Sequence, residues 1–463
     1  MTSSATKLTG LTGRVVVPGD DAYAAASAGF NLLFSHRPAV IVFAQDTADV
    51  VNALTWARRN GVPLRVRSGR HSLEGWSSVD DGIVIDVSDL KSATVDTVAG
   101  TATVGAGLNQ LEAVTVLGDA GVAAPTGTEG SVGLVGATLG GGFGLLTRTF
   151  GMASDNLIAA EIVVASNDGG AQVITASSDD NADLLWALRG AGNGNFGIVT
   201  ALTYRIHPMT EPVYVTATWA GLDDLAAVFD AWQRCAPYTD ERLTSQLEIG
   251  IGGITLIGVL TSGSESEAAQ LLAPMVSIGD PEVSMTTGPW ADTYAGFQIP
   301  PAEEASNWKF WSQFVYQPFP PEAIDIVAAF MANAPGPQCN YFTNAFGGAV
   351  RRTEPAGGSA FAHRDALFYA EPGAGWGVRG DGVRATDDPL TEVALAWFAD
   401  FAAALAPFVA GAYSNVPNAG QADWASAYWG ANVERLRAVK ARYDPDNVFS
   451  YEQSIVAEGE TNR

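Results

Sequence analysis

Hydrophobic positions in the first two hundred residues alternate between strand-like runs and helical spacing. An apolar run at 39–44 is followed by a helical pattern within 49–60 and by a short strand at 63–67. This order predicts a strand, a helix and a second strand. The same two kinds of pattern predict further strands within 82–90, 93–100, 101–107, 158–173 and 198–208, and helices at 108–120 and 183–188.

The pattern changes near Pro208. Beyond it, strands at 213–220 and 245–263 are interleaved with amphipathic helices, which is typical of an antiparallel sheet with helices on one face. We therefore predict a second domain. Its helices are expected at 223–234, 265–275, 321–333 and 390–405, and a final helix at 432–442 is expected to end at Tyr-Asp-Pro.

Length and composition limit the possible classes of protein. The chain has 463 residues, 47% of them hydrophobic, which is enough for two or three folded domains. Its formal net charge of −25 repels nucleic-acid phosphates and anionic membranes, so an anionic ligand would need a local basic pocket. The N-terminal residues lack a signal-peptide pattern, and no uncharged apolar run of about 18 residues occurs. We expect a cytoplasmic protein with neither nucleic-acid nor membrane partners.

Side chains alone offer little chemistry. The cysteines, Cys235 and Cys339, leave one disulfide possible, and the four histidines have no metal-ligand spacing, so no metal site is predicted. The Gly-x-Ser-x-Gly nucleophile motif and the phosphate-binding P-loop motif are both absent. These absences favour a bound cofactor.

Two segments are candidates for holding that cofactor. Residues 65–71 (RVRSGRH) place three arginines and a histidine in one loop, where backbone N–H groups and guanidinium groups suit a pyrophosphate. Residues 127–156 are rich in glycine, which suits backbone that approaches a ligand closely, but they lack the Rossmann fingerprint. The alternatives are a solvated basic loop and a glycine-rich loop between strands.

Taken in order, several motifs resemble the berberine-bridge-enzyme-like group of FAD-linked oxidases, within the vanillyl-alcohol oxidase superfamily. The resemblance covers nearly the whole chain and includes a branch with bacterial 6-hydroxynicotine and secondary-metabolite oxidases. The residues that carry it are His36-Arg37-Pro38, Arg67-Ser68-Gly69-Arg70-His71, Gly140-Gly141-Gly142-Phe143-Gly144 with Arg148, Gly151, Asp155 and Asn156, the segment 185–200, and Asn432, Tyr443-Asp444-Pro445, Asn447 and Gln453-Ser454-Ile455.

The resemblance implies an α+β fold: a two-part FAD-binding domain of the PCMH type, with an inserted substrate domain of antiparallel sheet covered by helices. The FAD-binding domain would span residues 1–208 and be completed by 411–463, with the substrate domain at 209–410. FAD would be bonded covalently through its 8α carbon to His71. The implied cofactor-binding residues are Arg67, Ser68, Gly69, Arg70, His71, Ser72, Gly133, Gly136, Thr138, Gly140, Gly141, Gly142, Gly144, Asp155, Asn156, Ile198, Val199, Tyr428 and Asn432.

The chain departs from the pattern of this group at two positions. Arg70 stands where the loop usually has a second glycine, so that backbone position must tolerate a side chain. Glu129 stands where many relatives have a cysteine that forms a second bond to the flavin, so we expect attachment through His71 only. Val132 aligns with a residue that controls oxygen access, and its small side chain favours an oxidase.

A base is expected on the strand predicted around 363–371. Alternation places His363, Asp365, Leu367, Tyr369 and Glu371 on one face, and Glu371 or Tyr369 is the candidate base. Glu371 could instead be a surface residue where the strand ends before Pro372-Gly373. Tyr413 belongs to a Tyr-x-Asn pattern that borders the pocket in relatives.

The resemblance implies transfer of hydride from a small organic substrate, an alcohol, amine or polyketide-like molecule, to FAD, with O2 as acceptor and H2O2 as product. The alternatives are a flavin dehydrogenase of the same fold, including one that oxidises sugars, and a flavin-binding protein without turnover. The protein is expected to be a monomer or a homodimer.

Overall fold

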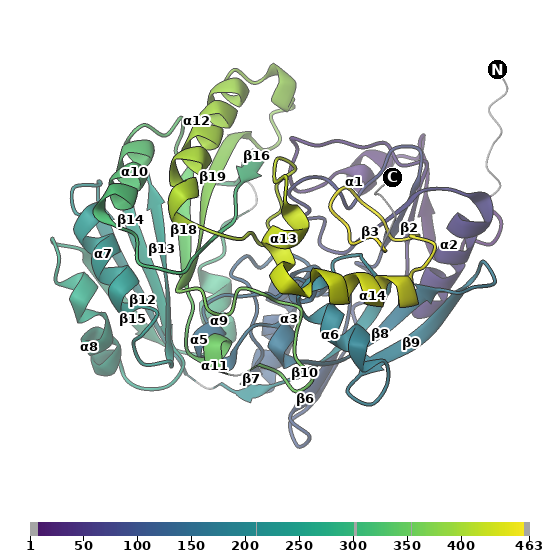
Figure 1. Cartoon of the computed structure of the whole chain (residues 1–463), viewed down its shortest axis with the longest axis horizontal. Helices are drawn as coiled ribbons and strands as arrows, with labels where there is room; N and C mark the ends of the chain where they lie inside the picture. The colour runs from purple at the N-terminus through teal and green to yellow at the C-terminus, as the bar shows by residue number, and fades with distance from the viewer. Residues whose placement is uncertain (1–7, 210, 301–302, 353, 458–463) are drawn as a thin grey trace.

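The fold was obtained as a computed structural model, which describes residues 8–209, 211–300, 303–352 and 354–457. Helices and mainly antiparallel strands are mixed along the chain, so the predicted α+β class is confirmed. Figure 1 shows two bodies side by side, with the N-terminal strands at one end and a large sheet at the other.

A four-stranded sheet near the N-terminus contains the predicted strand–helix–strand unit. Its order is β1-β2-β4-β3, and β2, β4 and β3 are parallel. Helix α2 begins after Asp46, which accepts a hydrogen bond from the backbone of Asp49, and it ends at the left-handed Gly61. The elements are β1 (Arg14–Val16), α1 (Tyr23–Ser27), β2 (Val40–Phe43), α2 (Thr47–Asn60), β3 (Leu64–Arg67) and β4 (Ile83–Asp86).

A five-stranded antiparallel sheet follows, in the order β5-β6-β10-β8-β9. The glycine-rich segment runs beside it as short helices and loops. The elements are β5 (Ala93–Asp96), β6 (Thr101–Gly105), α3 (Gln110–Asp119), β7 (Val122–Ala123), α4 (Leu134–Leu139), α5 (Thr147–Phe150), β8 (Leu157–Ala165), β9 (Ala171–Ser177), α6 (Ala182–Ala191), β10 (Ile198–Arg205) and β11 (His207–Pro208).

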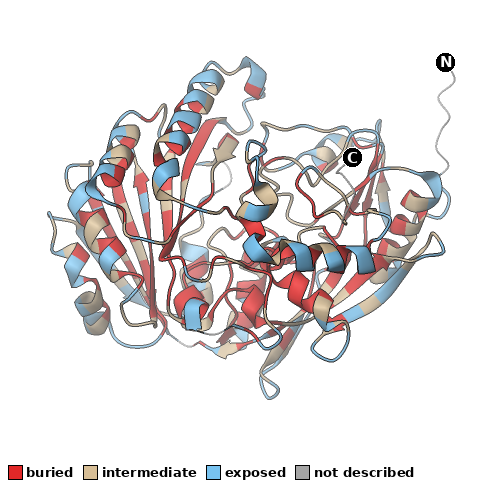
Figure 2. Cartoon of the chain, in the orientation of Figure 1, coloured by how far each residue is buried: buried red, intermediate tan, exposed pale blue. Residues whose placement is uncertain are grey.

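The third sheet has eight strands and lies in the second half of the chain. Helices α7, α8, α10 and α12 pack their apolar sides against one of its faces, and Figure 2 shows their outer sides exposed. The strands are β12 (Val213–Ala220), β13 (Leu243–Gly250), β14 (Gly253–Leu260), β15 (Glu282–Thr287), β16 (Ala305–Phe310), β17 (Gln313–Val315), β18 (Asn340–Ala345) and β19 (Phe368–Val378). The helices are α7 (Leu225–Cys235), α8 (Glu265–Val276), α9 (Trp290–Gly296), α10 (Pro321–Ala332), α11 (Ala349–Arg352) and α12 (Leu390–Leu405).

The buried apolar residues form two main cores. One joins residues 40–206 to the C-terminal segment, including α13 (Trp424–Trp429) and α14 (Val433–Tyr443). The other contains residues from Val213 to Leu405. This agrees with a division at 208/209 and 410/411, and the exact bounds stay a prediction.

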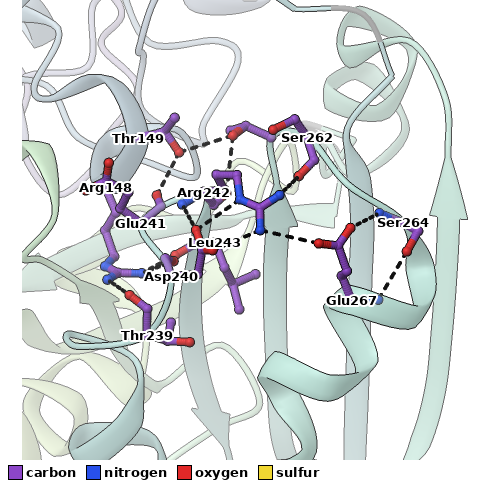
Figure 3. A network of polar contacts seen from close by, with 11 residues as sticks. Arg148, Thr149, Thr239, Asp240, Glu241, Arg242, Leu243, Ser262, Ser264 and Glu267 are labelled. Carbon is purple, nitrogen blue, oxygen red and sulfur yellow. Dashed lines mark hydrogen bonds and ion pairs between the residues drawn. The ribbon is translucent and has the colours of Figure 1, made fainter.

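Arg148 in α5 joins the two bodies. Its guanidinium donates hydrogen bonds to five backbone carbonyls, those of Pro237, Thr239, Asp240, Leu243 and Phe346. Figure 3 shows this arginine beside the loop that leads into β13. Burial lowers its pKa to about 10, and the charges of Glu241 and Asp240 oppose that shift.

The strand predicted around 363–371 was placed too early and ended too soon. Strand β19 begins at Phe368, so His363 and Asp365 lie in a loop and only Tyr369 and Glu371 share a strand face. The strand also continues past Pro372. The carbonyl of Pro372 accepts a hydrogen bond from Trp311 N, which lies between β16 and β17. The side of Pro372 that lacks an N–H therefore faces the break between these two strands, and the sheet loses no ladder hydrogen bond.

Helix α12 with the turn after it, Leu390–Phe408, is long and apolar enough by length and composition to cross a membrane. Its buried side, including Trp397, Phe398 and Phe401, is part of the second core, which accounts for its composition. The disulfide left possible by the sequence does not form, because Cys235 and Cys339 are both free.

Candidate functional site

A cavity lies where β3 ends, between the loop after it, helix α4 and the C-terminal segment. The space between its lining atoms, including the part open to solvent, is about 1290 Å³. Nine of the predicted cofactor-binding residues line it: Arg67, Ser68, Gly69, Arg70, His71, Ser72, Gly133, Gly136 and Val199. The basic loop and part of the glycine-rich segment therefore meet at one cavity.

Backbone rather than side chains forms much of this wall. A Cβ on Gly69 would lie 2.2 Å from Gly133 N, so the loop and the start of α4 meet only because both residues are glycine. Among the described residues, the backbone N–H groups of Gly69, Arg70 and His71 have no hydrogen-bond partner. Successive free N–H groups suit an anionic group such as a pyrophosphate.

Open space beside two other glycines also fits a bound group. Gly136 and Gly194 line the cavity, and a Cβ on either would meet no atom within 4 Å. Asn193 lines it too, and its buried Oδ1 has no partner in the described part of the chain. An acceptor of this kind suits an N–H or O–H on a ligand. These observations fit the expected FAD.

Two of the three loop arginines, Arg67 and Arg70, bond within the protein, and a role for the guanidinium groups as pyrophosphate forks stays a prediction. Arg67 Nε bonds to Asp86 Oδ2 at 2.7 Å, and its Nη2 donates to the carbonyl of Ala26. Arg70 Nε lies 3.5 Å from the same carboxylate, whose side chain is fully buried. Asp86 therefore offsets one of the two positive charges, and the free backbone N–H groups remain for the ligand.

Arg70 adopts φ = 63°, the left-handed region that favours glycine. This explains why the related loops usually have glycine at this position. Its guanidinium compensates in part by donating to the carbonyl of Ala25 at 2.9 Å.

His71 lines the cavity with its ring fixed. The ring stacks on Phe30 with centroids 4.1 Å apart, and Nε2 lies 2.8 Å from Ser131 Oγ. Burial lowers the pKa of His71 to about 4, and the charge of Arg379 acts in the same direction. The ring is therefore neutral at pH 7, with one nitrogen carrying a lone pair.

The other predicted cofactor-binding residues do not line the cavity. The contacts they make stabilise its surroundings: Thr138 bonds to Tyr204, Asp155 to Arg364, Asn156 to His207, Tyr428 to Gln453, and Asn432 to the carbonyl of Ala360. Gly140, Gly141, Gly142 and Gly144 pack closely against neighbouring atoms, and Ile198 lies in β10. Direct contact between these residues and a cofactor stays a prediction.

Tyr413 connects the glycine-rich segment to the cavity wall. Its hydroxyl accepts from Gly142 N at 2.8 Å and from Asn415 Nδ2 at 2.7 Å. Asn415 lines the cavity. The ring of Tyr413 lies 5.7 Å from that of Tyr369. Tyr413 therefore lies between Tyr369 on β19 and Asn415 in the cavity wall.

Tyr369 and Glu371 form a pair on that face. The Tyr369 hydroxyl donates to Glu371 Oε2. Burial raises the pKa of Glu371 to about 7, the Tyr369 hydrogen bond lowers it, and the negative charge of Glu248 raises it. The pKa of Tyr369 lies well above its usual value because of burial and the Glu371 charge, so the phenol keeps its proton. Glu371 is thus poised to exchange a proton near neutral pH.

Several cavity residues were not predicted from the sequence. Trp76 and Tyr451 line it, and their rings come from segments far apart in the chain. The glycine loop at 190–197 was noticed, but nothing in its composition singled out Asn193. Only the fold brings these residues together.

Comparisons with known proteins agree with this geometry. An FAD binding domain model matches residues 38–172, and a berberine and berberine like model matches residues 412–456. The chain is 38% identical over 450 residues to the uncharacterized FAD-linked oxidoreductase YgaK of Bacillus subtilis (strain 168), covering 96% of this chain and 97% of YgaK. The chain belongs to the berberine-bridge-enzyme-like family of FAD-linked oxidoreductases.

Two more known proteins are similar to this berberine-bridge-like chain. (R)-6-hydroxynicotine oxidase of Paenarthrobacter nicotinovorans is 33% identical over 211 residues, 45% of each protein. The solved structure of Physcomitrella patens BBE-like 1 superimposes with a TM-score of 0.87 at 26% identity, covering 96% of this chain and 97% of that one. The predicted family and fold are confirmed, and the protein is an FAD-dependent oxidoreductase.

Proposed function

We propose that the protein is an FAD oxidase whose flavin is bonded to His71 alone. It oxidises a small alcohol, amine or polyketide-like molecule, and O2 is reduced to H2O2. The Tyr369–Glu371 pair carries the proposal, since it places a base with a pKa of about 7 next to Tyr413, which is hydrogen-bonded to Asn415 in the cavity wall.

The residues divide the work between binding and proton transfer. The N–H groups after β3 and the open glycines of α4 and the 193–197 loop hold the cofactor. When bound, FAD supplies the hydride acceptor and the donor of two electrons to O2. Glu371 takes the O–H or N–H proton of the substrate, and Tyr369 stabilises the carboxylate form by its hydrogen bond.

Attachment through His71 alone is supported by the surroundings of the cavity. Neither Cys235 nor Cys339 lines it. Glu129, at the position where relatives have a cysteine, is hydrogen-bonded to Ser131. A carboxylate at this place offers no thiolate for a second bond.

The neighbourhood of Glu371 favours an apolar or aromatic substrate. Tyr369 and Tyr413 belong to a buried cluster with Phe143, Phe314, Phe346 and Phe361. Aromatic rings contribute contact area that suits a planar or apolar molecule. Val132 lines the cavity. Its small side chain favours access of O2 to the flavin, and this supports an oxidase over the dehydrogenase alternative.

The test is oxygen uptake and peroxide formation with a panel of secondary alcohols, cyclic amines and hydroxylated aromatic molecules. An oxidase consumes one O2 per substrate and releases one H2O2. Flavin reduction without oxygen uptake would instead indicate the dehydrogenase. If no panel member reduces the flavin, the flavin-binding protein without turnover is favoured.

A further inference from the structure

A chain of hydrogen bonds ends at Nε2 of His71. Ser131 Oγ is 2.8 Å from His71 Nε2 and 2.7 Å from Glu129 Oε1. A carboxylate accepts hydrogen bonds and donates none, so the single hydroxyl proton of Ser131 goes to Glu129. The Ser131 oxygen must then accept from His71, which places the ring proton on Nε2. The lone pair of the neutral ring is left on Nδ1.

The loop that carries Glu129 and Ser131 is held from two bodies of the protein. Gln110 in α3 donates to the carbonyl of Glu129 at 2.6 Å. Gln298, which follows α9, accepts from Gly130 N at 2.6 Å and donates to the carbonyl of Thr128 at 3.1 Å. Ser131 N also donates to Glu129 Oε1 at 3.0 Å. With Phe30 stacked on the ring, the arrangement is rigid before any ligand binds.

We propose that Glu129 and Ser131 are positioning residues for the covalent attachment of FAD: they hold the His71 proton on Nε2, present Nδ1 as the nucleophile, and accept the Nε2 proton as the bond forms. This rests on the proposed attachment at His71. A group that accepts a hydrogen bond from one ring nitrogen fixes the tautomer of a histidine in this way.

Attachment releases two protons and two electrons. The flavin 8α-methyl carbon loses one hydrogen, the imidazole loses its N–H hydrogen, and one carbon–nitrogen bond forms. The two electrons and one proton remain on the isoalloxazine ring, while the imidazole proton leaves Nε2. O2, the acceptor in the proposed function, then takes the two electrons and both protons as H2O2. Glu129, through Ser131, is the first acceptor of the imidazole proton.

The experiment measures covalent attachment rather than turnover. Wild type, Ser131→Ala and Glu129→Gln are purified, given excess FAD, and sampled over time by acid precipitation, with flavin fluorescence read on the denatured chain. Total bound flavin before precipitation reports whether each variant folds and binds FAD. We expect equal total flavin and an attachment rate at least about tenfold lower in both variants, since general acid–base groups contribute about 10²–10⁴-fold.

Two further variants test whether the hydrogen bonds of Ser131, and not the loss of any nearby charge, set the attachment rate. Ser131→Thr restores the hydroxyl and should restore the rate. Glu304→Gln removes another carboxylate whose charge is felt near Glu129 but which takes no part in the hydrogen bonds of Ser131, and it should attach flavin at the wild-type rate. NMR of the isolated flavin peptide should place the bond on Nδ1.

The outcomes distinguish this inference from the proposed function. If wild type loses all its flavin to the acid supernatant, attachment at His71 fails and the positioning role fails with it. If wild type retains flavin and both Ser131→Ala and Glu129→Gln attach it at the same rate, the positioning role alone is overturned. A bond at Nε2 would also overturn it.

Discussion

The two walls of the site are built in different ways. The wall at His71 is made of neighbouring residues and bare backbone, the loop after β3 packed against the start of α4. The wall at Glu371 joins three distant segments through the side chains of Tyr369 and Tyr413 and the backbone N–H of Gly142. The first wall is suited to holding a cofactor of fixed shape, and the second can change with the substrate while the fold is kept.

The largest expected effect comes from removing the proposed base, Glu371, on the second wall. Glu371→Gln keeps the shape and loses the proton acceptor, so kcat should fall by about 10²–10⁴-fold while the flavin stays bound. In wild type, kcat should rise as pH increases through about 7, because only the ionised carboxylate acts as base. The variant should lose this rise. Steady-state rates across pH check it, and a normal profile in the variant would exclude Glu371.

A matched control variant tests the assignment of Glu371 as the base. Glu248 adds a negative charge that raises the pKa of Glu371, and its own side chain is exposed on β13. Glu248→Gln should therefore keep the rate at high pH and move the rise in kcat to lower pH. A shift in the opposite direction would contradict the electrostatic account.

The next largest effect concerns the hydrogen bonds of Arg148 that join the two bodies of the fold. Arg148→Met removes the donor for five buried carbonyls and should lower the free energy of unfolding by about 3 kcal/mol or more. Arg242→Met, in the same network of Figure 3, breaks half-exposed ion pairs and should cost less than about 1 kcal/mol. Thermal and urea unfolding of the holoprotein measure both, and equal losses would contradict the role of Arg148.

A smaller effect is expected at Tyr369. Tyr369→Phe removes the hydrogen bond that lowers the pKa of Glu371, so that pKa should rise. The rise in kcat then moves to higher pH, and the rate at pH 7 falls several-fold while the rate at high pH recovers. A loss that high pH does not restore would mean that Tyr369 itself contacts the reacting atoms.

The smallest effect tests the first wall. Arg70→Gly relieves the left-handed backbone but loses the bond to Ala25, whereas Arg70→Ala keeps the strain and loses the same bond. The glycine variant should therefore be more stable than the alanine variant by about 1 kcal/mol. Urea midpoints at equal flavin content decide it, and equal stability would mean that the φ at this position carries no strain.

These differences explain what could be predicted from the sequence. The loop at 65–71 and the glycines at 133 and 136 are short-range features whose backbone requirements are visible in the residue types, and the structure brings them to one cavity. The sequence also suggested guanidinium forks. It could not show that Asp86, on a neighbouring strand, forms ion pairs with Arg67 and Arg70.

Contacts between side chains that lie far apart in the sequence could not be predicted in this way. Asn415 and Asn193 meet at 2.6 Å although they lie far apart in the chain, and no local pattern marks that contact. The end of β19 was misjudged because Pro372 usually stops a strand, and only the break between β16 and β17 makes it acceptable.

The most direct test of the account is where the flavin resides in the purified protein. Acid precipitation followed by proteolysis and peptide mass mapping should find flavin on the peptide that contains His71 and on no cysteine peptide. His71→Ala should release its flavin to the acid supernatant. Flavin that leaves the wild-type chain on precipitation, or that is bonded to Cys235 or Cys339, would contradict the account.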